Sequence, residues 1–96
     1  MKKIILNEIE YELVKNYKDG FDSEELLKKY TDYFDIYDYI VGDWSYGKLR
    51  LKGFCEKENK INNNINNIDT FDKYIKENCA FDCRYFALKK IAKNRL

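Results

Sequence analysis

The sequence has no histidine and no proline, and its positive and negative charges are almost equal in number. Histidine is the commonest general base and a common metal ligand, so its absence disfavours the triads and metal sites that depend on it. The 18 Lys and Arg residues against 17 Asp and Glu residues give a net charge of +1, which by itself indicates neither a nucleic-acid nor a membrane partner. No apolar stretch approaches the roughly 18–20 residues of a membrane span.

Cysteine is also scarce, with three in 96 residues. Cys79 and Cys83 lie close together and Cys55 stands alone. A zinc site usually takes two ligand pairs, and a redox pair usually has the C-x-x-C spacing at the start of a helix. We therefore expect buried, unreactive thiols, with zinc or redox chemistry as the alternative, and predict no cofactor. The N-terminal apolar run is too short for a secretory leader, so we expect a cytoplasmic protein.

Aromatic residues, by contrast, are abundant: they make up 17% of the chain and include nine tyrosines. Each ring can bury roughly 150–250 Å², which helps a small chain to form a core. Length and composition together predict one globular domain over residues 1–96.

Two hairpins and a helix are predicted in the first half of the chain. Apolar and polar residues alternate over residues 3–17, which predicts a hairpin. A helix then begins at Asp22 or Ser23. Strands follow over residues 36–44, where Gly42 suggests a bulge or bend, and over residues 48–56. The apolar stripe of the helix comprises Leu26, Leu27, Tyr30, Tyr33 and Phe34.

The second half contains a loop, a helix and a strand. Residues 57–67 are polar and low in complexity, which predicts a long surface loop or a poorly ordered one. The second helix begins at Asp69 or Thr70, a last strand covers residues 81–91, and a tail follows. The order ββαββαβ predicts an α+β fold, with a single mixed or antiparallel sheet and about two helices packed on it. The stripe of the second helix comprises Phe71, Tyr74 and Ile75.

The central hairpin, residues 37–54, contains the only tryptophan and three of the four glycines. Because side chains alternate across a strand, its basic residues share one face and its apolar residues the other. The predicted basic row is Lys48, Arg50 and Lys52. Trp44 and Tyr46 are expected beside the row, at the turn.

Two interpretations of this hairpin remain open. Cations flanked by aromatic rings suit a phosphate backbone with unstacked bases. Alternatively, the row is a solvated strand face whose charges pair with Asp38 or Asp43 on the neighbouring strand. The candidate binding residues are Asp43, Trp44, Tyr46, Lys48, Arg50 and Lys52.

The run YDYIVGDWSYGKLRLKGF resembles the signature segment of the YutD-like domain family of Gram-positive bacteria and their wall-less relatives. The stretch ENCAFDCRYFALKK, with Cys79 and Cys83, and the opening YELVKNYKDGFDSEEL are also similar to that family. The resemblance covers about residues 9 to 90, and departs from the family pattern at Ser45, Lys48 and Cys55. It implies a compact α+β fold and supplies no catalytic residues.

Two classes of function follow from the sequence. The first is a non-enzymatic cytoplasmic module that binds RNA, DNA or a ribonucleoprotein through the basic row and its aromatic neighbours. The second is a protein-interaction or assembly domain that uses the same surface, since Trp, Tyr and Arg are common in binding hot spots. Neither class involves a membrane.

Overall fold

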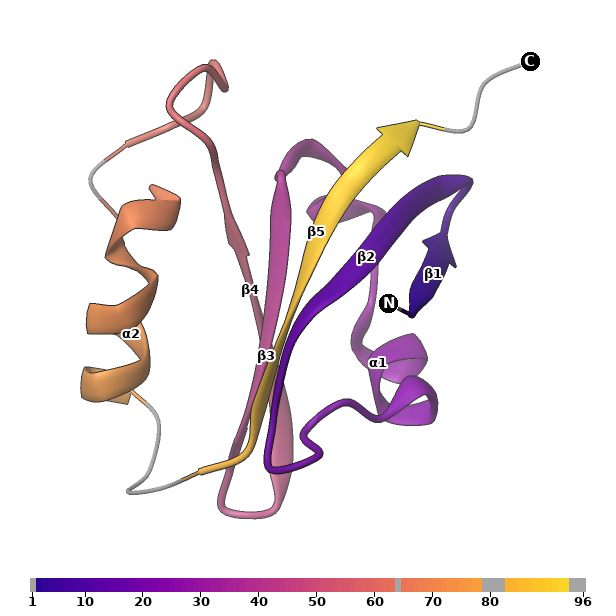
Figure 1. Ribbon diagram of the computed structural model, residues 1–96, viewed down its shortest axis with the longest axis vertical. Coiled ribbons are helices and arrows are strands. Elements are labelled where there is room, and N and C mark those ends of the chain that lie inside the picture. The colour runs from indigo at the N-terminus through magenta and orange to yellow at the C-terminus, as the bar shows by residue number, and fades with distance from the viewer. Residues whose placement is uncertain (1, 64, 79–82, 94–96) are drawn as a thin grey trace.

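The computed structural model describes residues 2–63, 65–78 and 83–93. Five antiparallel strands form one sheet in the order β1-β2-β5-β3-β4 (Figure 1). The strands are β1 (Lys3–Leu6), β2 (Ile9–Tyr17), β3 (Tyr39–Ser45), β4 (Lys48–Phe54) and β5 (Tyr85–Lys93). The helices are α1 (Ser23–Lys29) and α2 (Phe71–Asn78), with the 3-10 helices η1 (Asp32–Ile36) and η2 (Ile68–Thr70). The predicted α+β fold and element order are therefore confirmed, and no helix in the described ranges is long and apolar enough to cross a membrane.

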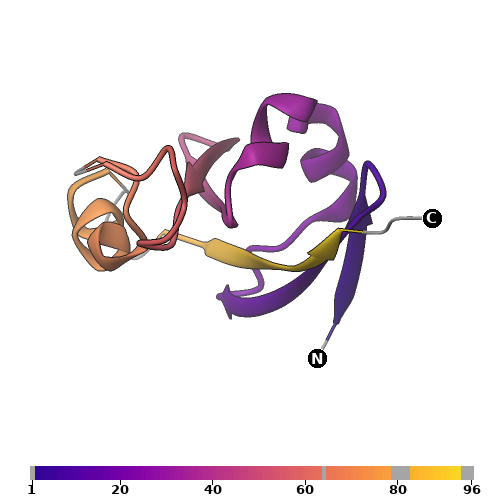
Figure 2. The same ribbon diagram turned by 90° about the horizontal axis from the view of Figure 1, so that it is seen from above.

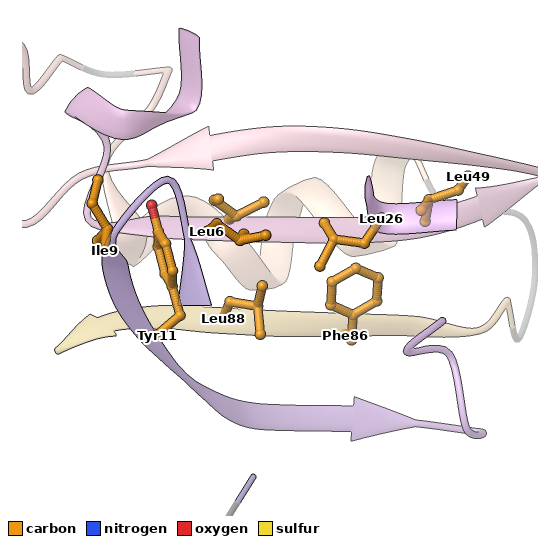
Figure 3. Packing of buried hydrophobic residues seen from close by; sticks show 8 residues of the cluster. Leu6, Ile9, Tyr11, Leu26, Leu49, Phe86 and Leu88 are labelled. Carbon is orange, nitrogen blue, oxygen red and sulfur yellow. The ribbon is translucent and has the colours of Figure 1, made fainter. Parts of the chain in front are cut away.

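The last strand completes the sheet by entering between the two hairpins. β5 pairs with β2 on one side and with β3 on the other, so it joins the N-terminal hairpin to the central one (Figure 1). Adjacent residues point to opposite faces, which gives the sheet two apolar clusters. Ile40 belongs to the larger cluster, on the side of α1, and Val41 belongs to a smaller one that α2 covers. Figure 3 shows the larger cluster, with Leu26 of α1 over Phe86 of β5 and Leu88 further along that strand.

Both hairpins close with two residues in the left-handed region. The pairs are Asn7 and Glu8 (φ 51° and 65°) and Tyr46 and Gly47 (φ 52° and 76°). Two positive φ values in succession match the right-handed twist of the flanking strands, which is why such turns dominate tight hairpins. The turns therefore set the register of β1 with β2 and of β3 with β4.

The first helix is shorter than its predicted apolar stripe. It begins as expected, because the Asp22 carboxylate accepts a hydrogen bond from the Glu25 backbone N–H. It ends at Lys29, where Tyr30 turns to an extended conformation, and the chain re-enters helical geometry only as η1. Leu27, inside α1, is 63% exposed, and Tyr33, beyond its end, is 60% exposed, so neither is buried as predicted.

The bulge or bend predicted at Gly42 is wrong, because the β3–β4 and β3–β5 ladders run through Gly42 without a shift of register. Gly42 is needed for space instead: a Cβ there would lie 2.3 Å from the Phe86 ring. The register shifts of this sheet lie in the β2–β5 pairing, between Glu10 and Tyr11 and between Leu13 and Lys15 of β2. A glycine in a strand can thus indicate a close side-chain approach as well as a bulge.

Several observed element boundaries differ from the predicted ones by a few residues. β3 begins at Tyr39 instead of residue 36, because η1 occupies the residues before it. α2 begins at Phe71, and Asp69 and Thr70 lie in η2, which Asn67 caps. β5 begins at Tyr85, after Cys83 and Arg84, and extends to Lys93, into the predicted tail, while residues 81 and 82 lie outside the described part of the chain.

The asparagine-rich segment 57–67 is held by its own side chains. Asn63 and Asn66 each accept a hydrogen bond from the other's backbone N–H, at 2.9 and 2.8 Å, and the Asn66 amide donates to the Ile61 carbonyl. At its start, the Asp38 carboxylate accepts from the Glu56 N–H and from the Asn59 amide. Of the two predicted alternatives, the surface loop is therefore the one observed for its described residues.

We expect Gly42→Ala to destabilise the fold by about 1–3 kcal/mol, because the added methyl group must displace the Phe86 ring inside the core. Urea unfolding measures the effect. Gly47→Asn is the matched control: no atom lies within 4 Å of a Cβ at Gly47, and Asn tolerates its positive φ. Equal stabilities of the Gly42 variant and the unsubstituted protein would contradict the packing described here.

Candidate functional site

The alternation predicted for β4 is confirmed. Lys48 and Arg50 are exposed and Leu49 is buried, so the basic residues do share one face of the strand. That face is the one that α2 covers further along, where Phe54 packs in the smaller cluster. The basic row therefore runs from the hairpin turn towards a helix.

Arg50 forms an ion pair with a buried carboxylate. Its guanidinium donates to Asp43 Oδ2 at 2.5 Å, across the β3–β4 ladder, and Asp43 is fully buried while the Arg50 side chain is 45% exposed. The other carboxylate oxygen, Oδ1, accepts from the Tyr74 hydroxyl of α2 at 3.1 Å. The hydrogen bond to Asp43 raises the pKa of Arg50, while burial and then the charge of Asp43 raise the pKa of Tyr74 to about 12. This Asp43–Arg50–Tyr74 cluster links β3, β4 and α2.

Lys52 lies against aromatic rings instead of projecting into solvent. Its ammonium is 5.1 Å from the centre of the Phe54 ring and 5.7 Å from that of Tyr74. Contacts of this kind attract a cation by the ring quadrupole. Two of the three cations in the basic row thus make contacts that hold the domain together.

Trp44 does not lie beside the basic row, so that expectation is wrong. It pairs with Leu49 in the ladder and points to the α1 face, where it packs against the larger cluster. Its indole N–H donates to the Gly20 carbonyl at 2.8 Å, and the Arg84 guanidinium stacks 4.3 Å from its ring centre. Trp44 therefore ties the β2–α1 connection to β3.

Tyr46 and Lys48 are the predicted site residues that remain at the surface of the hairpin turn. Tyr46, which has a positive φ at the turn, is 98% exposed. Lys48 is exposed at the start of β4. The six candidate residues thus lie in three places: the face that α2 covers, the opposite face and the hairpin turn. Their role in binding stays a prediction.

The cysteines differ from one another. Cys83 is disulfide-bonded, so the expectation of an unreactive thiol is wrong for this residue. The spacing of the cysteines in the sequence did not distinguish a free thiol from a disulfide. Cys55 is a buried free thiol as expected, and burial raises its pKa. Cys79 lies outside the described residues. Within the described ranges, no three Cys, Asp or Glu side chains gather in a way that could hold a metal ion.

Sequence reasoning missed a groove beside β4, of about 300 Å³. η1 contributes aromatic side chains to it, and the 57–67 loop contributes Ile65, which is 74% exposed. No local pattern indicated it, because Tyr33 fits the predicted helical stripe and only the structure shows that α1 ends at Lys29. The lining residues are Tyr33, Phe34, Tyr37, Leu51, Lys52, Gly53, Asn63, Ile65 and Asn66.

Comparison with known proteins identifies the family. Residues 5–89 match the family model described as "YutD-like: Putative antitoxin YutD-like". The chain belongs to the YutD-like family. It is 50% identical over 90 residues to a Bacillus subtilis (strain 168) protein named "Putative antitoxin YutD", a match that covers 94% of this chain and 99% of that relative.

A solved structure supports the fold as well. The chain is similar to the solution NMR structure of protein yutD from B. subtilis, with a TM-score of 0.81 and 47% sequence identity. The match covers all of this chain and 87% of that one. The YutD-like resemblance inferred from the central hairpin is therefore confirmed, and with it the α+β fold.

We expect Arg50→Ala to destabilise the domain by about 2–3 kcal/mol, because it leaves the Asp43 carboxylate buried without its cation. Lys48→Ala, two residues earlier on the same face, should change the stability by less than about 0.5 kcal/mol. Chemical unfolding of both variants at neutral pH gives the comparison. If the two substitutions cost the same, the ion pair is not structural.

The tyrosines predict a loss of stability at high pH. The pKa values of Tyr11, Tyr39 and Tyr74 are raised from 10 to about 12, in each case mainly by burial. A raised pKa in the folded state means that the protonated form contributes stability in full below pH 10, and that this contribution is lost as the pH rises from 10 to 12. Urea unfolding at intervals between pH 9 and 12 should show this fall, and Tyr74→Phe should make it shallower. A flat profile across that range would contradict the burial of these hydroxyls.

Proposed function

We propose that the chain is a non-catalytic, cytoplasmic protein-binding module whose partner is another protein. The observation that carries this proposal is the groove beside β4, which is flanked by large apolar side chains in solvent: Tyr33 is 60% and Ile65 is 74% exposed. Ile36, in the same 3-10 helix as Tyr33, is 54% exposed. Exposed apolar surface around a hollow is typical of protein-interaction sites.

The charges also favour a protein partner over nucleic acid. Affinity for a phosphate backbone comes from cations that neutralise phosphates. Here Arg50 is engaged with Asp43 and Lys52 with two aromatic rings, which reduces the contribution of the predicted row. The net charge of +1 adds no general attraction for nucleic acid.

The name of the B. subtilis relative is consistent with this proposal. An antitoxin acts by opposing a toxin, and a toxin that is a protein would be a partner of the proposed kind. We carry this over from the relative's name "Putative antitoxin YutD" as part of the proposal.

Nucleic-acid binding is the second candidate, because Tyr46 and Lys48 combine an exposed ring with an exposed cation at the hairpin turn. A ring of this kind can stack on a base while the ammonium contacts a phosphate. The candidate surface is thereby reduced from the predicted row to the turn.

We expect a tagged form of the chain to retain a protein at a fixed stoichiometry from a nuclease-treated lysate of the organism that encodes it. Retention should persist from about 0.15 to about 0.5 M salt, because an apolar contact is little affected by screening. Quantitative mass spectrometry of the retained fraction is the measurement. The proposal would be contradicted if the partner were retained from an untreated lysate but lost from the nuclease-treated one, or if no protein were retained at a fixed ratio.

The alternative has its own test, a titration of labelled single-stranded RNA followed by fluorescence anisotropy at two salt concentrations. If the turn binds nucleic acid, affinity falls steeply with salt and is lost in Tyr46→Asn combined with Lys48→Ala. This pair of substitutions leaves the Asp43–Arg50–Tyr74 cluster intact, and Asn suits the left-handed backbone at residue 46. We expect no binding of RNA at low salt.

A further inference from the structure

β4 is an edge strand, and the outer side of its backbone carries hydrogen-bonding groups directed away from β3. The tight turn at Tyr46 and Gly47 makes the flanking Ser45 and Lys48 a hydrogen-bonded pair, and such pairs alternate along an antiparallel ladder. The N–H and C=O groups of Leu49, Leu51 and Gly53 therefore point outward. Among the described residues, no backbone hydrogen bond reaches these groups from that side.

The chain itself demonstrates that this edge accepts another segment. The alternation continues to Cys55, whose outward N–H donates to the Asn66 carbonyl at 2.6 Å and whose carbonyl accepts from the Ile68 N–H at 2.9 Å. This contact, a parallel bridge with Asn67, pairs the end of the 57–67 loop with the edge immediately beyond β4. The edge thus changes from paired at Cys55 to open at Gly53.

The groove described above lies at this open part of the edge. Its lining includes Leu51 and Gly53 of β4, with Tyr33 from η1 and Ile65 from the loop. Figure 2 shows the β4 end of the sheet between the α1 segment and the loop that precedes α2. A chain laid along Leu49–Gly53 would occupy about 17 Å, the length of a five-residue strand.

Charge argues against a second copy of this chain as the occupant. Residues directly opposite in an antiparallel pair lie on the same face, so pairing two β4 strands through their outward groups places the basic row against itself. With Leu51 at the centre, for example, Arg50 opposes Lys52 of the second copy. Like charges in that position are destabilising, whereas carboxylates there would be attracted.

We propose that the free edge of β4 binds an extended segment of a partner protein as an added sixth strand of the sheet, which identifies the surface used in the proposed function and rests on it. The segment has acidic side chains at alternate positions on the face of the basic row, where Lys48 is exposed and the Arg50 side chain stays 45% exposed in its pair with Asp43. Its apolar side chains lie between them, on the face of Tyr33 and Leu51. Main-chain hydrogen bonds to Leu49, Leu51 and Gly53 supply the affinity, and the alternating side chains supply the specificity.

A synthetic peptide, Ile-Glu-Val-Glu-Ile with blocked ends, tests the chemistry directly. We expect it to shift the backbone amide NMR signals of Leu49, Leu51 and Gly53. Methylation of its central nitrogen, which removes one hydrogen bond to the edge, should weaken binding about tenfold. Ile-Lys-Val-Lys-Ile should bind more weakly still. Equal binding by the methylated peptide, or shifts confined to other strands, would overturn the proposal.

A substitution in the protein provides the reciprocal test. Leu51→Pro deletes an outward N–H without removing a hydrogen bond of the β3–β4 ladder, and Leu51→Ala shortens the side chain while retaining the N–H. We expect the peptide to bind the Ala variant at least about tenfold more tightly than the Pro variant. Should the Pro variant not fold, the methylated peptide still decides the question on the unsubstituted protein.

The two proposals can fail separately. If the protein partner from the lysate is retained equally by the Pro and Ala variants, the partner binds elsewhere: the proposed function stands and edge pairing is wrong. If the Ala variant retains the partner and the Pro variant does not, both are supported. If no partner is retained and the peptide does not bind, both fall.

Discussion

The ion pair between Asp43 and Arg50 is the interaction on which one whole face of the molecule depends. A fully buried carboxylate is costly unless it is paired and hydrogen-bonded. Asp43 obtains a cation from β4 and a hydroxyl from Tyr74 of α2. The cluster therefore fixes the position of α2 on a face whose buried apolar core is small, comprising Val41, Phe54 and Ala87.

Trp44, the next residue along β3, has the corresponding structural role on the other face of the sheet. Trp44 packs against the larger cluster, donates to the Gly20 carbonyl and lies under the Arg84 guanidinium. Because strand side chains alternate, Asp43 and Trp44 secure opposite sides of one sheet. The most distinctive stretch of the sequence, residues 37–54, thus has a direct structural role: it holds α2 on one face through Asp43 and the β2–α1 connection on the other through Trp44.

Because these side chains are structural, the candidate binding surface is the outer edge of the hairpin, along β4. The side chains of β4 are largely engaged, while no backbone hydrogen bond from the described residues reaches the outward groups of Leu49, Leu51 and Gly53. The neighbouring groove exposes Tyr33 and Ile65. Strand addition needs the backbone of the edge and only modest help from side chains. The like charges of the basic row also oppose the pairing of two β4 edges from separate copies of the chain.

Local patterns in the sequence determined the strands, the start of α1, the α+β order and the alternation of β4, because each depends on residues that are near neighbours in the chain. The capping of α1 by Asp22 and the separation of Lys48 from Leu49 are examples. The family likeness was accessible for the same reason, since its signature is one continuous segment. Tertiary structure alone decided the end of α1 at Lys29, the need for Gly42 beneath Phe86 and the engagement of Arg50. Phe86 is 44 residues from Gly42, and Tyr74 is 31 residues from Asp43. Whether a charge is available to a partner depends on such distant contacts, which no local periodicity encodes.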